Sequence, residues 1–177
     1  MKILVTDLDN IITNDTGLAA DAMEFLSGAH EKYFIVLLAN SPAKEMQERV
    51  KSLGLTEYID FVISAGDYEM QKPDARIINV LLAILNTESK KFGKTDLIMI
   101  GDKPDRDIKL ANNAGVQSVR IRRGKYASEE PEYSDEVAKI EVKTLAELMP
   151  VLGIDIKKAV PDAEKKAASR KRAAKKR

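Results

Sequence analysis

Residues 2–13 read KILVTDLDNIIT, and this stretch decides the fold class because a strand-like run ends directly in an acidic pair. Residues 3–6 (ILVT) are apolar or β-branched, as expected of a buried strand. Asp7 and Asp9 follow at once, one residue apart. Two carboxylates this close repel each other unless a positive group lies beside them. We therefore interpret the pair as part of a site at the end of a strand.

Strand-like and helix-like segments alternate along the rest of the chain. Continuous apolar runs predict further strands at residues 34–38, 61–64, 97–100 and 118–121, with a weaker one at 140–142. Helical spacing and helix-start signals fall between them, at residues 18–29, 41–54, 73–85, 108–114 and 144–147. Continuous rather than alternating apolar strands are typical of a parallel sheet covered on both faces. The sequence predicts a doubly wound, Rossmann-like α/β fold with a parallel sheet of about five or six strands and helices on both faces.

Three helix starts carry specific signals. Ser41 followed by Pro42 predicts a hydroxyl cap with proline at the first helical position. Pro73 is predicted to open the helix that runs to residue 85. Thr144 and Glu147 are spaced as a capping box, which predicts a short last helix.

Composition limits the class of protein. The 177 residues are 44% hydrophobic, which suits one globular domain, and we place it at residues 1–155. The absence of cysteine excludes disulfides, thiolate metal sites and thiol nucleophiles. Apolar runs such as residues 34–39 (FIVLLA) are far too short to span a bilayer, and no secretory leader is recognisable. We therefore expect a cytoplasmic protein that does not enter a membrane.

The charge of the chain is divided between two segments. Residues 156–177 carry ten Lys and Arg residues against Asp162 and Glu164, a net charge of +8, whereas residues 1–155 have a net charge of −7. This basic tail has no apolar face, so we expect a flexible segment or a marginal helix. Two interpretations stay open: a solubilising extension, or a segment that contacts an acidic macromolecule. The absence of aromatic residues among its charges weakens the case for single-stranded nucleic acid.

Polar residues collect where the predicted strands end, and in a doubly wound sheet that edge is where ligands bind. These residues are Asp7, Asp9, Asn40, Ser41, Lys72, Asp102, Asp105 and Asp107. Several carboxylates and one lysine are thereby expected to meet at one edge. Hard oxygen ligands of this kind suit Mg²⁺, which usually takes one or two protein carboxylates together with a substrate phosphate. We predict a Mg²⁺ site there.

Four segments in this order resemble the motifs of the haloacid dehalogenase superfamily of phosphatases. They are ILVTDLDN (residues 3–10), FIVLLANS (34–41), KPD (72–74) and LIMIGDKPDRDIKLANNAG (97–115), and the resemblance covers about residues 2–150. Each segment alone is a weak signal, but the joint order and the positions at strand ends make the resemblance specific. It implies a Mg²⁺-dependent phosphomonoesterase.

The resemblance also implies a role for each matching residue. Asp7 would be the nucleophile that forms an aspartyl phosphate, and Asp9 the general acid and then the general base. Asp7, the main-chain carbonyl of Asp9 and Asp102 would hold Mg²⁺. Lys72 would neutralise the phosphate, and Asp107 would orient Lys72 or a metal-bound water. Asp105 is a rival for the last role, although the register of the following residues favours Asp107.

One position departs from the family pattern. The Ser or Thr that normally ends the second strand corresponds to Ala39, followed by Asn40. Loss of one oxyanion donor is worth on the order of 2 to 4 kcal/mol of transition-state stabilisation. Either Ser41 or the Asn40 amide replaces that hydroxyl as a substrate-binding group, or activity is weak. A non-enzymatic binding domain with a decayed second motif is therefore the alternative function.

The spacing of the motifs bears on the substrate. The short segments between Asp9 and the second strand, and between Asn40 and Lys72, leave no room for an inserted cap domain. By resemblance, an open site would act on a bulky or macromolecular phosphorylated substrate, or would take its lid from a neighbouring subunit of a homo-oligomer. A basic cluster lies at the end of the fifth strand, either as a solvated loop or as a secondary phosphate or substrate contact: Arg120, Arg122, Arg123 and Lys125.

Overall fold

The computed structural model describes residues 1–87 and 89–155. The basic tail and its expected marginal helix lie outside these residues. Strands are β1 (Lys2–Thr6), β2 (Thr13–Asn14), β3 (Gly17–Leu18), β4 (Tyr33–Ala39), β5 (Phe61–Ser64), β6 (Leu97–Gly101), β7 (Gln117–Ile121) and β8 (Ile140–Val142). Helices are α1 (Ala22–His30), α2 (Ala43–Ser52), α3 (Arg76–Leu85), α4 (Lys109–Ala114) and α5 (Leu145–Val151). Short turns of helix are η1 (Gly66–Tyr68), η2 (Lys94–Asp96), η3 (Pro104–Ile108, a π-helical turn), η4 (Gly124–Tyr126) and η5 (Ser134–Glu136).

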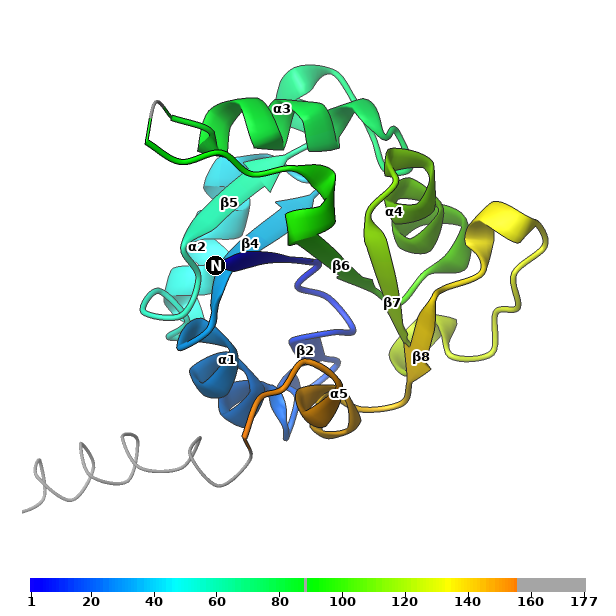
Figure 1. The fold of residues 1–177 in the computed structure, drawn as a ribbon. Coiled ribbons are helices and arrows are strands. Elements are labelled where there is room, and N and C mark those ends of the chain that lie inside the picture. The colour runs from blue at the N-terminus through cyan, green and yellow to red at the C-terminus, as the bar shows by residue number, and fades with distance from the viewer. Residues whose placement is uncertain (88, 156–177) are drawn as a thin grey trace, which may run out of the picture.

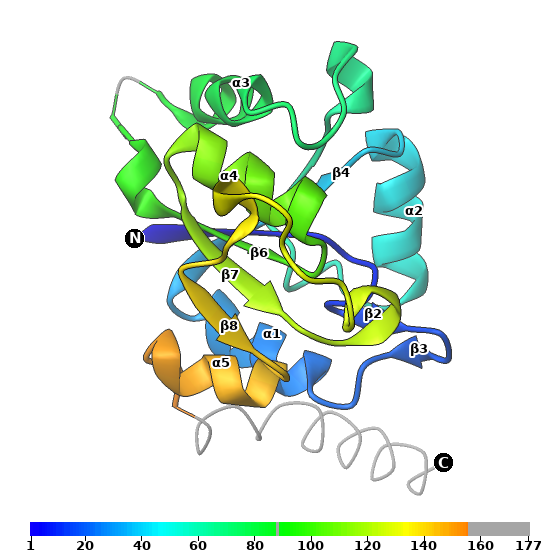
Figure 2. The ribbon, with the colours of Figure 1, turned by 90° about the vertical axis from the view of Figure 1, so that its right-hand side faces the viewer.

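Six strands form one parallel sheet in the order β5-β4-β1-β6-β7-β8. The central strands β1 and β6 are buried along nearly their whole length, which explains their continuous apolar sequences. Figures 1 and 2 show α3 and α4 on one side of the sheet and α1 and α5 on the other. The predicted doubly wound α/β fold is confirmed.

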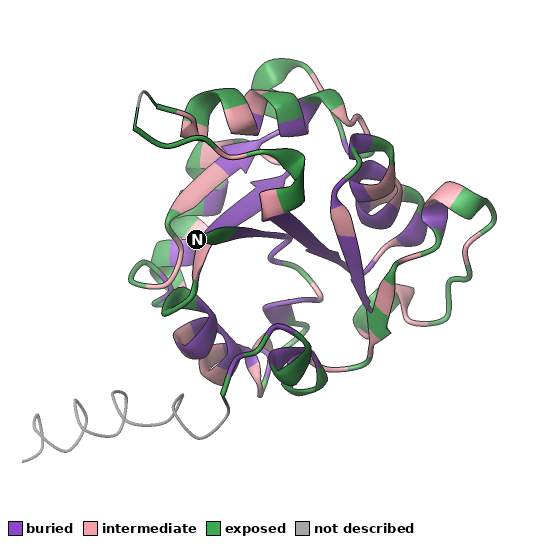
Figure 3. Cartoon of the chain, viewed as in Figure 1, coloured by how far each residue is buried: buried purple, intermediate pink, exposed green. Residues whose placement is uncertain are grey.

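The sheet separates two hydrophobic cores, because successive side chains of a strand point to opposite faces. Leu4 of β1 packs in the core that contains the buried residues of α1, α2 and α5. Ile3 and Val5 pack in the other core, with the buried residues of α3 and α4. Figure 3 shows this burial along the strands and on the inner sides of the helices.

Three of the predicted helix starts are wrong, those at Leu18, Ser41 and Pro73. Leu18 belongs to β3, which pairs with β2 in a small antiparallel hairpin, so α1 begins only at Ala22. Pro42, not Ser41, is the capping residue of α2, and the Asp67 carboxylate accepts a hydrogen bond from the Ala43 N–H at 3.1 Å. A distant carboxylate thus supplies the cap expected from the local serine.

The local signals at the starts of α3 and α5 have opposite outcomes. Pro73 precedes α3 by three residues rather than opening it, because the chain first makes a turn in which the Asp74 N–H donates to the Gln71 carbonyl oxygen. At α5 the predicted cap is confirmed, since the Glu147 N–H donates to Thr144 Oγ1 at 3.0 Å. No helix in the described ranges is long and apolar enough to cross a membrane.

Candidate active site

The two neighbouring central strands place two aspartates side by side at the carboxyl edge of the sheet. Thr6 of β1 pairs in register with Ile100 of β6. Asp7 follows Thr6 directly, and Asp102 follows Gly101 at the end of β6. Parallel pairing therefore brings together two carboxylates that are far apart in the sequence.

Lys72 joins the aspartates that follow these two strands. Its Nζ lies 2.6 Å from Asp7 Oδ2 and 2.9 Å from Asp107 Oδ1, and it also donates to the Leu38 carbonyl oxygen at 3.2 Å. The side chain is 1% exposed. Burial disfavours the charged amine, but attraction by Asp107 and Asp7 outweighs burial and raises the pKa of Lys72. Lys72 is therefore a buried, fully charged ammonium group in contact with the predicted nucleophile.

Arg106 is a second cation in the same place. Its Nη2 lies 3.3 Å from Asp7 Oδ2, 3.4 Å from Asp102 Oδ1 and 3.2 Å from Asp107 Oδ2. We call Asp7, Lys72, Asp102, Arg106 and Asp107 the reactive cluster. It contains three carboxylates and two cations, so it carries one excess negative charge when all five groups are ionised.

The excess negative charge affects the pKa of Asp102, which is completely buried. Burial, and then repulsion by Asp107, raise the pKa of Asp102 to about 7, although Asn10 and Arg106 act in the opposite direction. Burial also disfavours the charged form of Asp107, but Lys72 and Arg106 outweigh it and lower the pKa of Asp107. Asp102 is therefore the carboxyl group of the cluster that most lacks positive charge.

The structure decides between Asp105 and Asp107 as the partner of Lys72. Asp107 is buried and contacts Lys72, whereas Asp105 is exposed and pairs with Lys103 at 3.2 Å. Gly101 allows this arrangement, because a Cβ at that position would lie 2.2 Å from the Cβ of Asp107. The glycine of the G-D pair is thus needed for close packing of Asp107 against the end of β6.

The Asp9 side chain lies apart from the reactive cluster. Its Oδ2 accepts a hydrogen bond from Arg49 Nη1 at 3.0 Å, and its Oδ1 contacts Arg49 Nη2 as well as Thr13 Oγ1 at 3.2 Å. The hydrogen bonds from Arg49 lower the pKa of Asp9, and they outweigh partial burial. Asp9 is therefore an ionised carboxylate held by a cation of α2.

The polar residues after β4 occupy different positions. Asn40 Oδ1 accepts a hydrogen bond from the Lys72 N–H at 2.9 Å, so Asn40 fixes the backbone that carries the central lysine. Ala39 is buried in one of the two cores. Ser41 is half-buried and lies beyond the end of β4. Of the two predicted replacements for the missing hydroxyl, the structure connects Asn40 directly to Lys72.

Three further residues at this edge were not predicted from the sequence: Asn10, Arg49 and Arg106. Asn10 has a left-handed backbone with a φ of 59°, and its Nδ2 donates to Asp102 Oδ2 at 2.8 Å. Asparagine tolerates that backbone, and its place directly after the acidic pair is the one local signal that could have identified it. Arg49 lies on α2 without any distinguishing pattern around it, whereas Arg106 lies inside the matching segment 97–115, between Asp105 and Asp107.

The arginines at the end of β7 have hydrogen-bond and ion-pair partners within the protein. Arg120 is buried and donates to the carbonyl oxygens of Asp102 and two residues of the following loop, Tyr126 and Glu129. Arg123 contacts Asp21 at 2.8 Å and donates to the carbonyl oxygen of Asn10 at 3.1 Å. The interpretation as a solvated loop is therefore wrong for Arg120 and Arg123, since their guanidinium groups hold the backbone beside the site.

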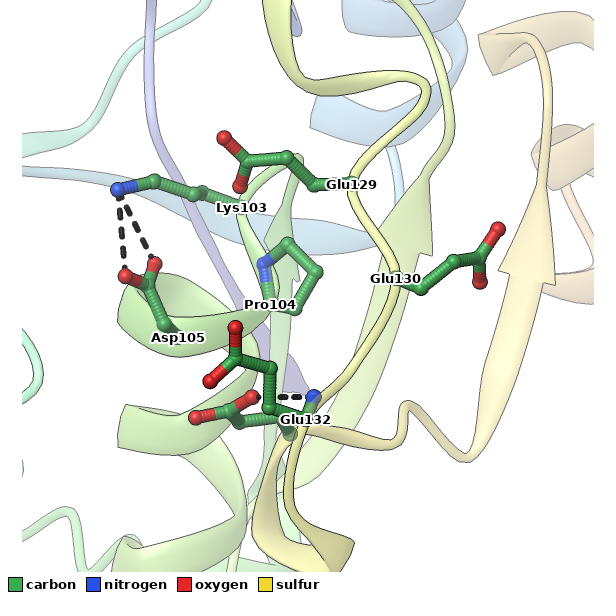
Figure 4. A pocket seen from close by; sticks show the side chains of 7 residues that line it. Lys103, Pro104, Asp105, Glu129, Glu130 and Glu132 are labelled. Atoms are coloured by element: carbon green, nitrogen blue, oxygen red, sulfur yellow. Dashed lines mark hydrogen bonds and ion pairs between the residues drawn. The ribbon is translucent and has the colours of Figure 1, made fainter.

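A pocket of about 440 Å³ lies beside the end of β6. Its lining includes Lys103, Pro104 and Asp105, which follow that strand. Figure 4 shows that Glu129, Glu130 and Glu132 of the loop after β7 also line this pocket, and that Lys103 pairs with Asp105. Its lining includes no residue of the reactive cluster. The many carboxylates of its lining would repel an anionic ligand.

The reactive cluster has the donor chemistry that Mg²⁺ requires. One oxygen of Asp7 and one of Asp102 already converge on the same cationic group, that of Arg106. Within the ranges 1–87 and 89–155, no three acidic, histidine or cysteine side chains form a complete metal cage. Mg²⁺ does not need one, because it commonly binds through one or two carboxylates and keeps several waters. A divalent cation would also supply the charge that Asp102 lacks.

Comparison of the sequence with known proteins finds one matching family and several relatives. The sequence model of the haloacid dehalogenase-like hydrolases matches residues 10–121, more than half of this chain. A glyceraldehyde 3-phosphate phosphatase of Methanopyrus kandleri is 31% identical over 110 residues, which cover 62% of this chain and 45% of the relative. The (S)-2-haloacid dehalogenase 4A of Burkholderia cepacia is 28% identical over 141 residues, covering 80% and 56%. This chain thus spans about half the length of these relatives.

Solved structures agree on the fold. The crystal structure of an uncharacterized protein from Listeria monocytogenes serotype 4b superposes with a TM-score of 0.72 at 21% identity, and the match covers 89% of this chain and 99% of that chain. At this identity the likeness establishes the shared fold and nothing finer. Taken with the family match over residues 10–121, it leads to one conclusion. The chain belongs to the haloacid dehalogenase-like hydrolase family.

Proposed function

We propose that this hydrolase cleaves phosphate monoesters, with Asp7 as the nucleophile. The observation that carries the proposal is the contact of Asp7 with both Lys72 and Arg106 at the carboxyl edge of the sheet. Two cations beside one carboxylate lower the repulsion that an anionic phosphate would otherwise meet there. The Leu8 N–H also donates to Asp7 Oδ1 at 2.7 Å, which restrains the carboxylate.

In the first step an oxygen of Asp7 attacks phosphorus and the bond to the leaving oxygen breaks, which forms an aspartyl phosphate. The leaving alkoxide takes a proton from Asp9. In the second step Asp9 accepts a proton from water, the water oxygen attacks phosphorus, and inorganic phosphate leaves Asp7 as a free carboxylate. Asp9 must release Arg49 and take up a proton from solvent before the first transfer, because the ion pair keeps it ionised. The second transfer then returns a proton to the carboxylate that the first one leaves.

Asp7, Asp102 and the main-chain carbonyl of Asp9 are the groups that we propose to hold Mg²⁺. When bound, the metal ion supplies charge neutralisation and orientation of the phosphate. Asn10 supports this role from behind, since its amide holds one oxygen of Asp102. Lys72 and Asp107 would keep the remaining charge of the cluster balanced.

The phosphatase reaction is preferred over dehalogenation, the other activity named among the relatives. A halide is a weak base and leaves without a proton, so dehalogenation has no use for an acid two residues beyond the nucleophile. An alkoxide needs that proton. The anionic excess of the reactive cluster also favours a reaction that recruits a divalent cation.

The connections around the site support a substrate of large size. Between Asp9 and β4 lie only the β2–β3 hairpin and α1, and between β4 and β5 only α2. We therefore propose a capless, cytoplasmic enzyme whose open site takes a bulky or macromolecular substrate or is covered by a neighbouring subunit. The basic tail would contact an acidic part of such a substrate.

The deciding experiment measures phosphate release from 4-nitrophenyl phosphate by the full chain, with Mg²⁺ and with EDTA, for the wild type and Asp7→Asn. We expect turnover that requires Mg²⁺ and falls at least about a thousandfold in the variant. Chloride release from 2-chloropropionate serves as the competing assay. Folded, Mg²⁺-binding protein without turnover would favour the second candidate, a non-enzymatic binding domain, which Ala39 and the arginine-bound Asp9 support.

A further inference from the structure

Arg49 holds the carboxylate that the proposed reaction needs to be free. Both terminal nitrogens of its guanidinium contact the two oxygens of Asp9, in the paired geometry that arginine forms with carboxylates. Arg49 projects from the last turn of α2, and Asp9 lies in the loop after β1. The pair is accessible, since the two side chains are 36% and 55% exposed. A ligand can therefore reach it without any rearrangement of the core.

The position of Arg49 follows from the role of Asp9. A general acid must reach the oxygen of the leaving group, so in the proposed reaction that group lies within reach of Asp9. Because Arg49 contacts Asp9, the same leaving group also comes near Arg49. The other two cations of the site are committed elsewhere, because Lys72 is buried between carboxylates and Arg106 contacts three of them.

Arg49 also differs from these cations because it can replace its carboxylate partner with another one. In the described part of the chain, Asp9 is the one carboxylate within ion-pair distance of Arg49. If Asp9 turns to the leaving oxygen, the guanidinium loses that partner while still facing the leaving group. An arginine fork of this kind binds a planar carboxylate through two parallel hydrogen bonds, as it already does with Asp9.

We propose that Arg49 is a substrate-binding residue that selects phosphate monoesters whose leaving group carries a carboxylate. The inference rests on the proposed phosphatase function. The substrate carboxylate takes the place of Asp9 on the arginine fork, and the released Asp9 turns to the leaving oxygen. A neutral leaving group makes no such exchange, so it binds more weakly and leaves Asp9 paired with Arg49. Selection then acts on both KM and kcat.

The test compares two substrates that differ only in the group of interest, 3-phosphoglycerate and glycerol 3-phosphate. Wild-type protein with Mg²⁺ is expected to have a kcat/KM at least about tenfold higher for 3-phosphoglycerate. Arg49→Gln should reduce this preference by about 10- to 100-fold, since it removes a charge-assisted hydrogen bond pair. Arg49→Lys keeps the charge but not the fork, and it should restore only part of the preference.

Lys51→Gln is the matched control, because it removes one positive charge from an exposed position of the same helix. It should leave the preference within about twofold of the wild type. Thermal unfolding of each variant verifies that the fold is retained.

The proposal is overturned if wild-type protein does not distinguish the two substrates. It is also overturned if Arg49→Gln lowers both kcat/KM values equally, because Arg49 would then act only on Asp9. Turnover of 4-nitrophenyl phosphate separates these results from failure of the proposed function. Wild type that cleaves the aryl phosphate but shows no carboxylate preference refutes the role of Arg49 alone, whereas wild type that cleaves none of the three refutes both.

Discussion

The reactive cluster and the arginines at the end of β7 use the same chemical groups for different purposes. We call Arg120, Arg122 and Arg123 the β7 arginine cluster. In the reactive cluster, three carboxylates face two cations, and one carboxyl group has a pKa raised to about 7. In the β7 arginine cluster, each guanidinium is surrounded by carbonyl oxygens and carboxylates. The first is short of positive charge, and the second is satisfied.

The difference shows how a charged group can be recognised as functional. A group of residues whose charges and hydrogen bonds are already complete has little to gain from a ligand. A buried group with uncompensated charge gains from any ligand that supplies the missing charge. By this criterion the acidic edge of the sheet is a site, and the basic end of β7 is part of the framework that supports it. The sign of the charge alone would have suggested a phosphate site at the basic end of β7 and not at the acidic edge.

After the loss of the nucleophile Asp7 itself, the largest effect is expected for the buried partner of Lys72. Asp107→Asn removes one of the two carboxylates that hold Lys72, so kcat/KM for 4-nitrophenyl phosphate should fall at least about a hundredfold. Asp105→Asn is the matched control, because Asp105 is exposed and pairs with Lys103. It should change kcat/KM by about twofold or less. Equal losses in both variants would contradict the assignment of Asp107 as the residue that orients Lys72.

A second prediction concerns stability and pH in EDTA. Because the folded-state pKa of Asp102 is raised to about 7 from 3.8, the folded protein binds this proton more tightly than the unfolded chain. Its contribution to the free energy of unfolding therefore declines as pH rises from about 4 to about 7, by on the order of 3 kcal/mol. Urea unfolding at pH 5 and pH 8 should show this loss in the wild type and a smaller loss in Asp102→Asn. Added Mg²⁺ should reverse it at pH 8 in the wild type, and identical pH profiles of the two proteins would contradict the charge imbalance.

The β7 arginine cluster should respond in stability rather than in chemistry. Arg123→Gln breaks the contacts with Asp21 and with the carbonyl oxygens of Asn10 and Ile11. We expect the free energy of unfolding to fall by about 2 kcal/mol, with kcat/KM at 25 °C lower by about threefold or less. Arg122→Gln, at a more peripheral position, should cost about 1 kcal/mol or less. A large loss of activity in folded Arg123→Gln would place this cluster in the chemistry and remove the contrast.

The two regions should also differ in how their stability depends on acidic pH, because the pKa of Asp21 is lowered whereas that of Asp102 is raised. Partial burial raises the pKa of Asp21, but the hydrogen bond and charge of Arg123 outweigh it and keep the pKa below its usual value. This stabilisation is present above pH 4 and is lost as pH falls through the folded-state pKa, which is the opposite direction to Asp102. Asp21→Asn should therefore flatten the acid limb of the stability curve by about 1 kcal/mol, measured by urea unfolding between pH 2 and pH 6. An unchanged acid limb would show that Arg123 is satisfied without Asp21.

The smallest expected effect tests the position at the end of β4. Ala39→Ser restores a hydroxyl where the family pattern has one, and we expect kcat/KM for 4-nitrophenyl phosphate to rise by about two- to tenfold. The modest size reflects Asn40, which already lies against the Lys72 backbone and can donate to a phosphoryl oxygen. The wild-type protein is the matched control, because alanine lacks only the hydroxyl of serine. A fall in activity with serine would mean that this strand end does not face the phosphate.

Much of the fold was predictable because strands are encoded locally. The observed β5 coincides with the predicted strand at residues 61–64, and β1, β4, β6 and β7 each extend one or two residues beyond the predicted runs. The β2–β3 hairpin was missed because strands of two residues contain no measurable period. The start of α2 was predicted one position too early because its cap is supplied by Asp67, which is distant in sequence.

For the site, the sequence by itself determined that Asp7 and Asp102 directly follow strands and that Lys72 and Asp107 lie in the segments after strands, and hence that the four would be neighbours. A parallel sheet makes that inference sound, because all its strands end at the same edge. Only the tertiary structure decided the partners of each charge. Arg49 and Asp9 are 40 residues apart, Arg106 and Asp7 are 99 apart, and Arg123 and Asn10 are 113 apart. No local pattern encodes such pairs, since the energy of an ion pair depends on distance and burial in the folded chain.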